Sequence, residues 1–461
     1  MNGSAFPIRV RLSATGLAMV CAFAGALPVR AQQLSFTPFH KNGIYELGER
    51  AGWTVTLAEG AIAPVNQYSY VIRKNNLDVM QKGALDLSSG SATIETKLNE
   101  PAMLYVEVAP NASPTAPPEA SAGNPAPGPV ARSQPAAPGR GSAIHLGAAI
   151  APWKLQPAVP RPADFDSFWD AKLKSLSEIP IHPVLTPTET SKAGVELHTV
   201  KLDSLGSHVQ GYLAKPAREG KFPALVIFQY AGVYALRPET VTDRAAEGWL
   251  AFDVDSHDMP PNEATGVGRS YQAIGNTDKE TSYFLNMYLR DARAIDYIAS
   301  RPDWDGKTIV VMGTSMGGHQ SLVAAGLNSR ITAVIVNEPS GADSNGDLHG
   351  RKAGYPNWPS DNPKVMATAL YFDTVNFASR IKAPVVAALG FIDTVAPPVG
   401  IWTAVNQVPG PKEVIPMIES DHNNLTPQKQ GAWDSRYKEV LALILRGGEF
   451  KPNQDLNGKM N

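Results

Sequence analysis

At residues 308–319 the chain reads Thr-Ile-Val-Val-Met-Gly-Thr-Ser-Met-Gly-Gly-His. The first five residues are mostly apolar and mostly β-branched, which is typical of a buried strand, and the residues from Gly317 onward have a helical pattern. Between the two lies a Gly-x-Ser-x-Gly turn centred on Ser315. Strand, tight turn and helix in this order form the setting in which such a turn exposes a nucleophilic serine. Ser315 is therefore a candidate nucleophile.

The pentapeptide alone is a weak signal, because at ordinary Gly and Ser frequencies roughly one chain in five of this length would contain it by chance. The surrounding pattern strengthens it. Helical patterns, the clearest at 282–300, separate most of the later strand-like runs, and an amphipathic helix is predicted at 162–177. Alternating strands and helices predict a mainly parallel sheet covered on both faces. The runs lie at 198–205, 209–214, 224–228, 249–254, 308–312, 333–336, 385–389 and 413–418, and the first two read as an antiparallel hairpin at the sheet edge.

A serine needs a base to act as a nucleophile. Asp393 follows the run at 385–389, and His422 follows the run at 413–418. Both residues therefore lie at carboxyl ends of strands, where open α/β sheets place their sites. The chain order Ser, Asp, His is that of the α/β-hydrolase fold. We expect His422 to take the proton of Ser315 and Asp393 to orient the imidazole.

Two further residues follow strands and are possible substrate contacts. Glu338 is a rival for the acid, and otherwise a residue of the site wall or a cap. His257 precedes Ser315 in the chain, which is the wrong order for the histidine of this triad, so a structural hydrogen bond or a substrate contact is expected.

An oxyanion hole requires two backbone N–H donors. We expect one from Met316, directly after the nucleophile, and the other from the loop after 224–228. In that loop Ala231 is favoured and Tyr230 is the alternative.

The N-terminal region has a different pattern. Short strand-like runs separated by turn residues at 34–109 predict a small all-β sandwich, immunoglobulin-like at coarse resolution. Residues 110–150 contain a long stretch rich in Pro, Ala, Gly and Ser, which predicts a linker. The catalytic domain is then expected at 151–450.

Residues 1–31 have the pattern of a secretory signal peptide. Arg9 and Arg11 precede an apolar run, and Val29-Arg30-Ala31 offers a cleavage site. The chain would then be secreted or periplasmic in a bacterium. Its formal net charge of −2 falls to about −5 without these residues, which gives no indication of a nucleic-acid or membrane partner.

Composition also excludes several chemistries. The single cysteine, Cys21, lies within the predicted signal peptide, so the remaining chain has no thiol nucleophile and no disulfide. No spacing typical of a metal site and no phosphate-binding glycine loop is present. We therefore expect neither a metal nor a cofactor.

From 162 to the C-terminus the chain resembles the acetyl xylan esterase and cephalosporin-C deacetylase family of carbohydrate esterases. The resemblance rests on Pro-Ala-Asp-Phe-Asp at 162–166, Tyr-Phe-Asp at 371–373, Arg-Ile-Lys-Ala-Pro at 380–384, the stretch 390–398 and the serine turn. It implies the same three residues: Ser315 as nucleophile, Asp393 as acid and His422 as base. Where the family has Arg-Gly-Gln after a strand, this chain has Asp255-Ser256-His257, which leaves the family's hexameric assembly open.

The sequence thus predicts a serine esterase that removes short acyl groups, chiefly acetyl, from carbohydrates such as xylo-oligosaccharides. Alternatives are another hydrolase on the same fold, such as a peptidase or a lactone or glucuronoyl ester hydrolase, and an inactive carbohydrate-binding protein. The oligomeric state, the role of the β domain, and whether 341–364 covers the site as a lid stay open.

Overall fold

The computed structural model describes residues 34–58, 68–111 and 143–453. The predicted signal peptide at 1–31 and most of the predicted linker lie outside these residues. None of the helices in the described ranges is long and apolar enough to cross a bilayer.

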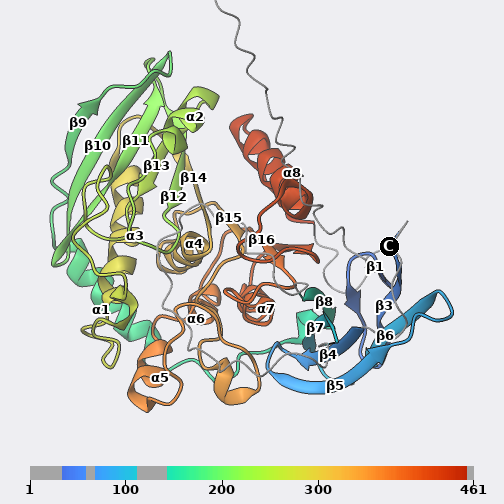
Figure 1. Ribbon diagram of the computed structural model, residues 1–461. Coiled ribbons are helices and arrows are strands. Elements are labelled where there is room, and N and C mark those ends of the chain that lie inside the picture. The colour runs from blue at the N-terminus through green and yellow to red at the C-terminus, as the bar shows by residue number, and fades with distance from the viewer. Residues whose placement is uncertain (1–33, 59–67, 112–142, 454–461) are drawn as a thin grey trace, which may run out of the picture.

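The larger part of the protein is built on one nine-stranded sheet (Figure 1). Its strands are β9 (Val184–Thr188), β10 (Val195–Ser204), β11 (Ser207–Pro216), β12 (Phe222–Phe228), β13 (Leu250–Val254), β14 (Trp304–Thr314), β15 (Ala333–Asn337), β16 (Val385–Gly390) and β17 (Lys412–Met417). They are arranged in the order β17-β16-β15-β14-β12-β13-β11-β10-β9. The six strands from β17 to β13 are parallel, and β11, β10 and β9 continue the sheet antiparallel.

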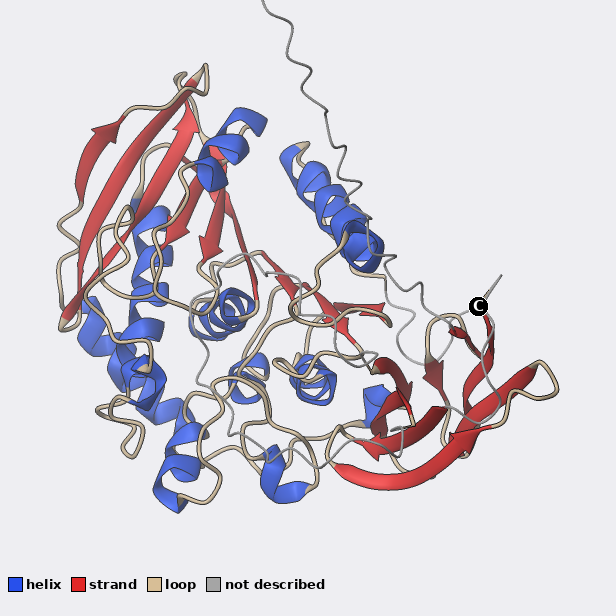
Figure 2. Ribbon diagram, viewed as in Figure 1, coloured by secondary structure: helices blue, strands red, loops and turns tan. Residues whose placement is uncertain are grey.

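Helices cover both faces of this sheet, as Figure 2 shows. The helices are α1 (Phe165–Ser177), α2 (Glu239–Glu247), α3 (Tyr283–Ser300), α4 (Met316–Leu327), α5 (Pro363–Ala369), α6 (Thr374–Ala378), α7 (Pro398–Gln407) and α8 (Pro427–Leu445). Apolar residues of α2 and α8 pack on one face, and those of α3, α4, α6 and α7 pack on the other. Short 3-10 helices lie at Pro152–Lys154, Tyr271–Ala273 and Gly346–His349. This architecture confirms the predicted α/β class.

The edge of the sheet differs from the prediction. The hairpin of β10 and β11 forms, but β9 pairs outside it, so the predicted edge strand β10 is internal. Pro187 obscured β9, because proline cannot donate to a ladder and therefore argues against a strand. An edge strand tolerates proline where that position needs no ladder hydrogen bond, which is the situation of β9.

The N-terminal residues form a separate β region, here called the β module, of two sheets. One sheet has the order β1-β3-β6 and the other the order β2-β8-β7-β4-β5. Buried side chains from both sheets meet in one apolar cluster. The strands are β1 (Leu34–Pro38), β2 (Ile44–Tyr45), β3 (Arg50–Leu57), β4 (Tyr68–Lys74), β5 (Asp78–Leu85), β6 (Ser91–Lys97), β7 (Ala102–Pro110) and β8 (Ile144–Ile150).

Strand β8 corrects the predicted linker, which extended over 110–150. Residues 144–150 pair antiparallel with β7 along its length, and Ala148 and Ile150 are fully buried. The small residues Gly147, Ala148 and Ala149 continue the composition of the preceding stretch, so composition alone did not separate the strand from it.

The β module packs against the C-terminal half of the large sheet (Figure 1). Ile44, Met103 and Ala149 belong to the same apolar cluster as the residues of that sheet. Phe391, directly after β16, lies against Gly43 and Gly147 with no room for a side chain at Gly147. A small pocket at this junction has a wall that includes Asn75, Tyr105, Phe391 and Asp393. The β module therefore supports the loop that follows β16.

Replacing Gly147 with alanine tests this contact. A Cβ atom at Gly147 would lie 2.5 Å from the Phe391 Cβ and 2.6 Å from its carbonyl oxygen. Because backbone must move to relieve this overlap, Gly147→Ala should lower the free energy of unfolding by about 1–3 kcal/mol in urea titrations. Gly431→Ala in α8 is the control, since a Cβ there meets nothing within 4 Å, and it should leave stability unchanged or raise it by up to about 1 kcal/mol. Equal stability of Gly147→Ala and the wild type would contradict the contact.

Candidate active site

The turn between β14 and α4 holds Ser315 in an unusual backbone conformation. Ser315 has φ 57° and ψ −123°, and its N–H donates to the Asn337 carbonyl at 2.9 Å. A Cβ atom at Gly313 would collide with the backbone of Gly317, and one at Gly317 would collide with the Phe228 carbonyl. These close approaches explain why both flanking positions are glycine. The strain places the serine at the N-terminus of α4, at the carboxyl ends of the central strands.

Ser315, His422 and Asp393 meet in one hydrogen-bonded chain. The His422 Nε2 lies 2.8 Å from the Ser315 Oγ, and its Nδ1 lies 2.7 Å from the Asp393 Oδ2. A carboxylate can only accept, so the proton of the neutral ring belongs on Nδ1 and Nε2 is free to accept from the serine. Burial lowers the pKa of His422, but the hydrogen bond and the negative charge of Asp393 outweigh it and raise this pKa above its ordinary value.

The loop after β16 holds Asp393 from its other side. The Asp393 Oδ1 accepts hydrogen bonds from the N–H groups of Val395 and Ala396, each at 2.8 Å. Asp393 is fully buried. Its second oxygen is thereby directed at His422, as expected for a residue that orients the ring.

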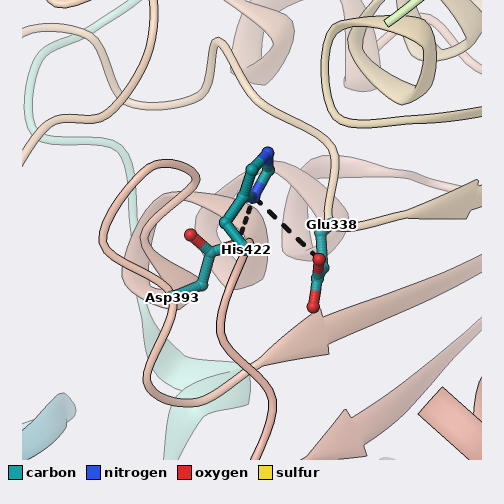
Figure 3. A group of neighbouring side chains, drawn as sticks. All are labelled: Glu338, Asp393 and His422. Carbon is teal, nitrogen blue, oxygen red and sulfur yellow. Dashed lines mark hydrogen bonds and ion pairs between the residues drawn. The ribbon is translucent and has the colours of Figure 1, made fainter. Parts of the chain in front are cut away.

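Glu338 lies on the other side of the same imidazole nitrogen (Figure 3). Its carboxylate is fully buried, and its Oε2 is 3.9 Å from the His422 Nδ1. Burial, followed by the charge of Asp393, raises the pKa of Glu338 to about 7. The Glu338 side chain has no exposed surface, so the structure lends no support to the predicted substrate contact and is compatible with the other prediction, a residue of the site wall or a cap.

Glu338, Asp393 and His422 also have the donor types that bind metals, and their ligand atoms lie within 4.8 Å of one another. Here the imidazole Nδ1 is engaged by the Asp393 Oδ2 at hydrogen-bond distance, and the other Asp393 oxygen accepts two backbone N–H groups. These contacts engage Asp393 and His422 in hydrogen bonds, and the Glu338 Oε2 lies 3.9 Å from the same Nδ1.

The loop after β12 lies against the serine turn. The Gln320 side chain in α4 donates to the Gln229 carbonyl at 2.9 Å, and the Ser256 hydroxyl donates to the Gln320 side chain at 3.0 Å. Among the described residues, the N–H groups of Met316, Ala231 and Tyr230 donate no hydrogen bond to the protein. These three N–H groups thus lack a protein acceptor, which an oxyanion hole requires of its donors, and Ala231 and Tyr230 both stay candidates.

His257 supports this loop from within the protein. Its ring nitrogens lie 2.9 Å from the Gly232 carbonyl and 2.9 Å from the Tyr283 hydroxyl, and the residue is buried. The structural hydrogen bond predicted for His257 is thus present, and the alternative, a substrate contact, is not supported because both ring nitrogens are engaged inside the protein.

No role in this support network was predicted from the sequence for several of its residues. Gln229, Ser256, Gln320 and Tyr283 are ordinary polar residues on four separate segments, and only the fold brings them together. The position of Gln229, just after a strand that borders the serine turn, was the one available clue.

The segment 341–364 borders the site next to Met316. The hydroxyls of Tyr355 and Tyr271 both lie against the Met316 sulfur, at 3.2 Å and 3.3 Å. The Tyr355 N–H donates to the Val395 carbonyl, and the Lys352 N–H donates to the Asn75 carbonyl of the β module. This segment is thereby bonded to the Asp393 loop and to the β module.

Comparison with known proteins identifies the family of the chain. The family model described as acetyl xylan esterase (AXE1) matches residues 153–345 and 355–437, more than half of the chain. The acetyl esterase Axe7A of Xylanibacter ruminicola is 29% identical over 437 residues, which cover 90% of this chain and 93% of that protein. That coverage is too large for the α/β part alone, so the alignment includes residues of the β module.

Two solved structures are similar in fold. The acetyl xylan esterase from Paenibacillus sp. R4 has a TM-score of 0.56 and 25% identity, covering 64% of this chain and 98% of its own. Acetyl xylan esterase 1 from Thermoanaerobacterium sp. JW/SL YS485 has a TM-score of 0.53 and 22% identity, covering 64% of this chain and 96% of its own. The predicted α/β-hydrolase fold is confirmed.

The buried His257 predicts an acid-dependent loss of stability. Burial lowers the pKa of His257 to about 4, from 6.5 in an unfolded chain, so the unfolded state binds the extra proton first as pH falls. This penalty is absent above pH 6.5 and develops between pH 6.5 and 4. Between pH 7 and pH 5 it amounts to about 2 kcal/mol.

His257→Gln removes this titration. The variant should be less stable than the wild type at pH 7, because hydrogen bonds to Gly232 and Tyr283 are perturbed, and the difference should shrink by about 2 kcal/mol at pH 5. Urea unfolding at the two pH values measures this. A difference that stays constant with pH would show that His257 does not have to remain neutral in the fold.

Proposed function

The chain belongs to the acetyl xylan esterase family, and from this membership and the geometry at Ser315 we propose that it is a secreted serine esterase. Its substrates would be acetylated carbohydrates such as xylo-oligosaccharides, and its reaction would proceed through an acetyl-serine intermediate. As a family member, the protein is a carboxylic ester hydrolase.

The observation that carries the proposal is the hydrogen-bonded chain from Ser315 through His422 to Asp393. In the proposed reaction His422 accepts the Ser315 proton as the serine oxygen attacks the acetyl carbonyl carbon. The imidazolium then gives that proton to the leaving sugar oxygen as the carbon–oxygen bond breaks. Water, activated by the same histidine, hydrolyses the acetyl-serine and releases acetate.

The negative charge of each tetrahedral intermediate would be held by backbone N–H groups. Met316 supplies one, since it follows Ser315 at the positive end of the α4 dipole. Ala231 supplies the other, with Tyr230 as the alternative. One such donor is typically worth about 3 kcal/mol of transition-state stabilisation.

Secretion is supported by the basic, apolar and small-residue segments within residues 1–31. The expected substrates are small or oligosaccharide esters.

Replacing Ser315 with alanine tests the reaction. Ser315→Ala should lower kcat for p-nitrophenyl acetate and for acetylated xylo-oligosaccharides by about 10⁴-fold or more, because the attacking oxygen is lost. The measurement is initial-rate kinetics on both substrates, with acetate release quantified for the oligosaccharide.

Ser321→Ala is the matched control. Ser321 is also buried in α4, but its hydroxyl donates back to the Gly317 carbonyl within the helix and not to His422. This variant should keep its activity within about threefold, since such a back-bond contributes little. Unchanged turnover in Ser315→Ala would refute the proposed mechanism. Faster hydrolysis of aminoacyl-peptide or uronate esters than of acetylated sugars would refute the proposed substrate.

A further inference from the structure

We propose that Glu338 is a positioning residue that acts with Asp393 as a second carboxylate partner of His422. This inference rests on the proposed function, because it assigns a partner to the histidine that activates Ser315. It goes further by giving the histidine two acidic neighbours with different tasks.

The topology places the three residues together. Glu338 directly follows β15, Asp393 follows β16 and His422 follows β17, and these strands are neighbours in the sheet. Figure 3 shows the two carboxylates on different sides of the imidazole, with both dashed lines ending on the same nitrogen. The Nδ1 to oxygen distances are 2.7 Å for Asp393 and 3.9 Å for Glu338. Asp393 is thus the hydrogen-bond acceptor, and Glu338 is close enough to act through its charge.

The hydrogen bonds of Glu338 direct one oxygen at the ring. Its Oε1 accepts from the Ser420 hydroxyl at 3.0 Å and from the Gln430 amide at 3.2 Å. Its Oε2 is buried and has no hydrogen bond among the described residues. A carboxylate retained only for packing is expected to have both oxygens bonded, since an unpaired buried oxygen is costly. The unpaired atom here is the one that faces His422.

The backbone at Glu338 is also strained. Its φ is 45°, in the left-handed region that a residue with a Cβ adopts at a cost of about 1–3 kcal/mol. Its N–H nevertheless donates to the Ala388 carbonyl of β16 at 2.8 Å. The strand end is therefore held in the conformation that delivers the carboxylate to the histidine.

Charge explains what the second carboxylate does. Two charged groups act on Glu338 and His422: Asp393 from the loop after β16, and Asp421 next to the histidine in the chain. The Asp421 Oδ2 is paired with the Lys429 Nζ of α8 at 2.9 Å. Tyr105 of β7 faces Asp421 from the β module. Burial raises the pKa of Glu338 to about 7, so its negative charge appears as the pH rises through neutrality. That charge stabilises the imidazolium that forms when Ser315 gives up its proton.

Glu338→Gln keeps the shape of the side chain and removes its charge. Without that charge the imidazolium is less stable, so the acid limb of kcat/KM for p-nitrophenyl acetate should move to lower pH. The plateau of kcat above pH 8 should fall about three- to tenfold, with KM unchanged. Glu338→Asp, which retains the charge, should keep the acid limb closer to that of the wild type.

Glu419→Gln is the matched control. Glu419 is exposed and precedes His422 by three residues, and no contact with the imidazole is present. This variant removes the same charge from the loop after β17, which carries His422, and should leave the pH profile unchanged.

A double-mutant cycle gives the second readout. Among the described residues, Glu338 is the carboxylate left within 4 Å of Nδ1 in Asp393→Asn, so this variant should retain at least about tenfold more kcat than Asp393→Asn with Glu338→Gln. Circular dichroism and urea unfolding establish that each variant is folded. If Glu338→Gln is not folded, the pH profile of Glu338→Asp decides: an acid limb moved well away from that of the wild type overturns the inference.

The inference alone is also overturned by pH profiles of Glu338→Gln and wild type that superimpose, or by equal kcat in the single Asp393 variant and the double variant. Full activity of Ser315→Ala, or of Asp393→Asn with Glu338→Gln, would instead overturn the proposed function. The two failures are therefore distinguishable in one set of proteins.

Discussion

The site depends on a backbone constraint at the turn between β14 and α4. Ser315 can take its positive φ only because Gly313 and Gly317 let three stretches of backbone approach to direct contact. The strain costs about 1–3 kcal/mol and is met by the surrounding packing. It projects the serine hydroxyl toward His422 and leaves the Met316 N–H beside the loop after β12. A side chain at either glycine would separate these elements.

The parallel sheet positions the other residues of the site around this turn. Three successive strands, β15, β16 and β17, end at the same edge and deliver Glu338, Asp393 and His422. Phe391, two residues before Asp393, rests on Gly147 of the β module, and Tyr355 joins the Asp393 loop to Met316. Residues of both the α/β part and the β module therefore contact the loop after β16 that carries Asp393.

The sequence was informative where function follows local pattern. A strand, a glycine turn and a helix identified Ser315, and the order of strand ends identified Asp393 and His422, which the structure brings within hydrogen-bond distance of one another. It was uninformative where placement depends on distant segments. Pro187 argued against the edge strand β9, and the small residues of β8 did not distinguish it from the linker before it. Glu338 was expected near the site, but its buried position beside the His422 Nδ1, with hydrogen bonds from Ser420 and Gln430 far away in the chain, had no local signal.

During turnover Ser315 is proposed to carry the acyl group. Mass spectrometry of protein quenched in acid shortly after mixing with p-nitrophenyl acetate tests this. We expect one added acetyl group per chain, located by fragmentation on the peptide that contains Ser315. Rapid turnover with no acetylated peptide, or with the acetyl group on another residue, would contradict it.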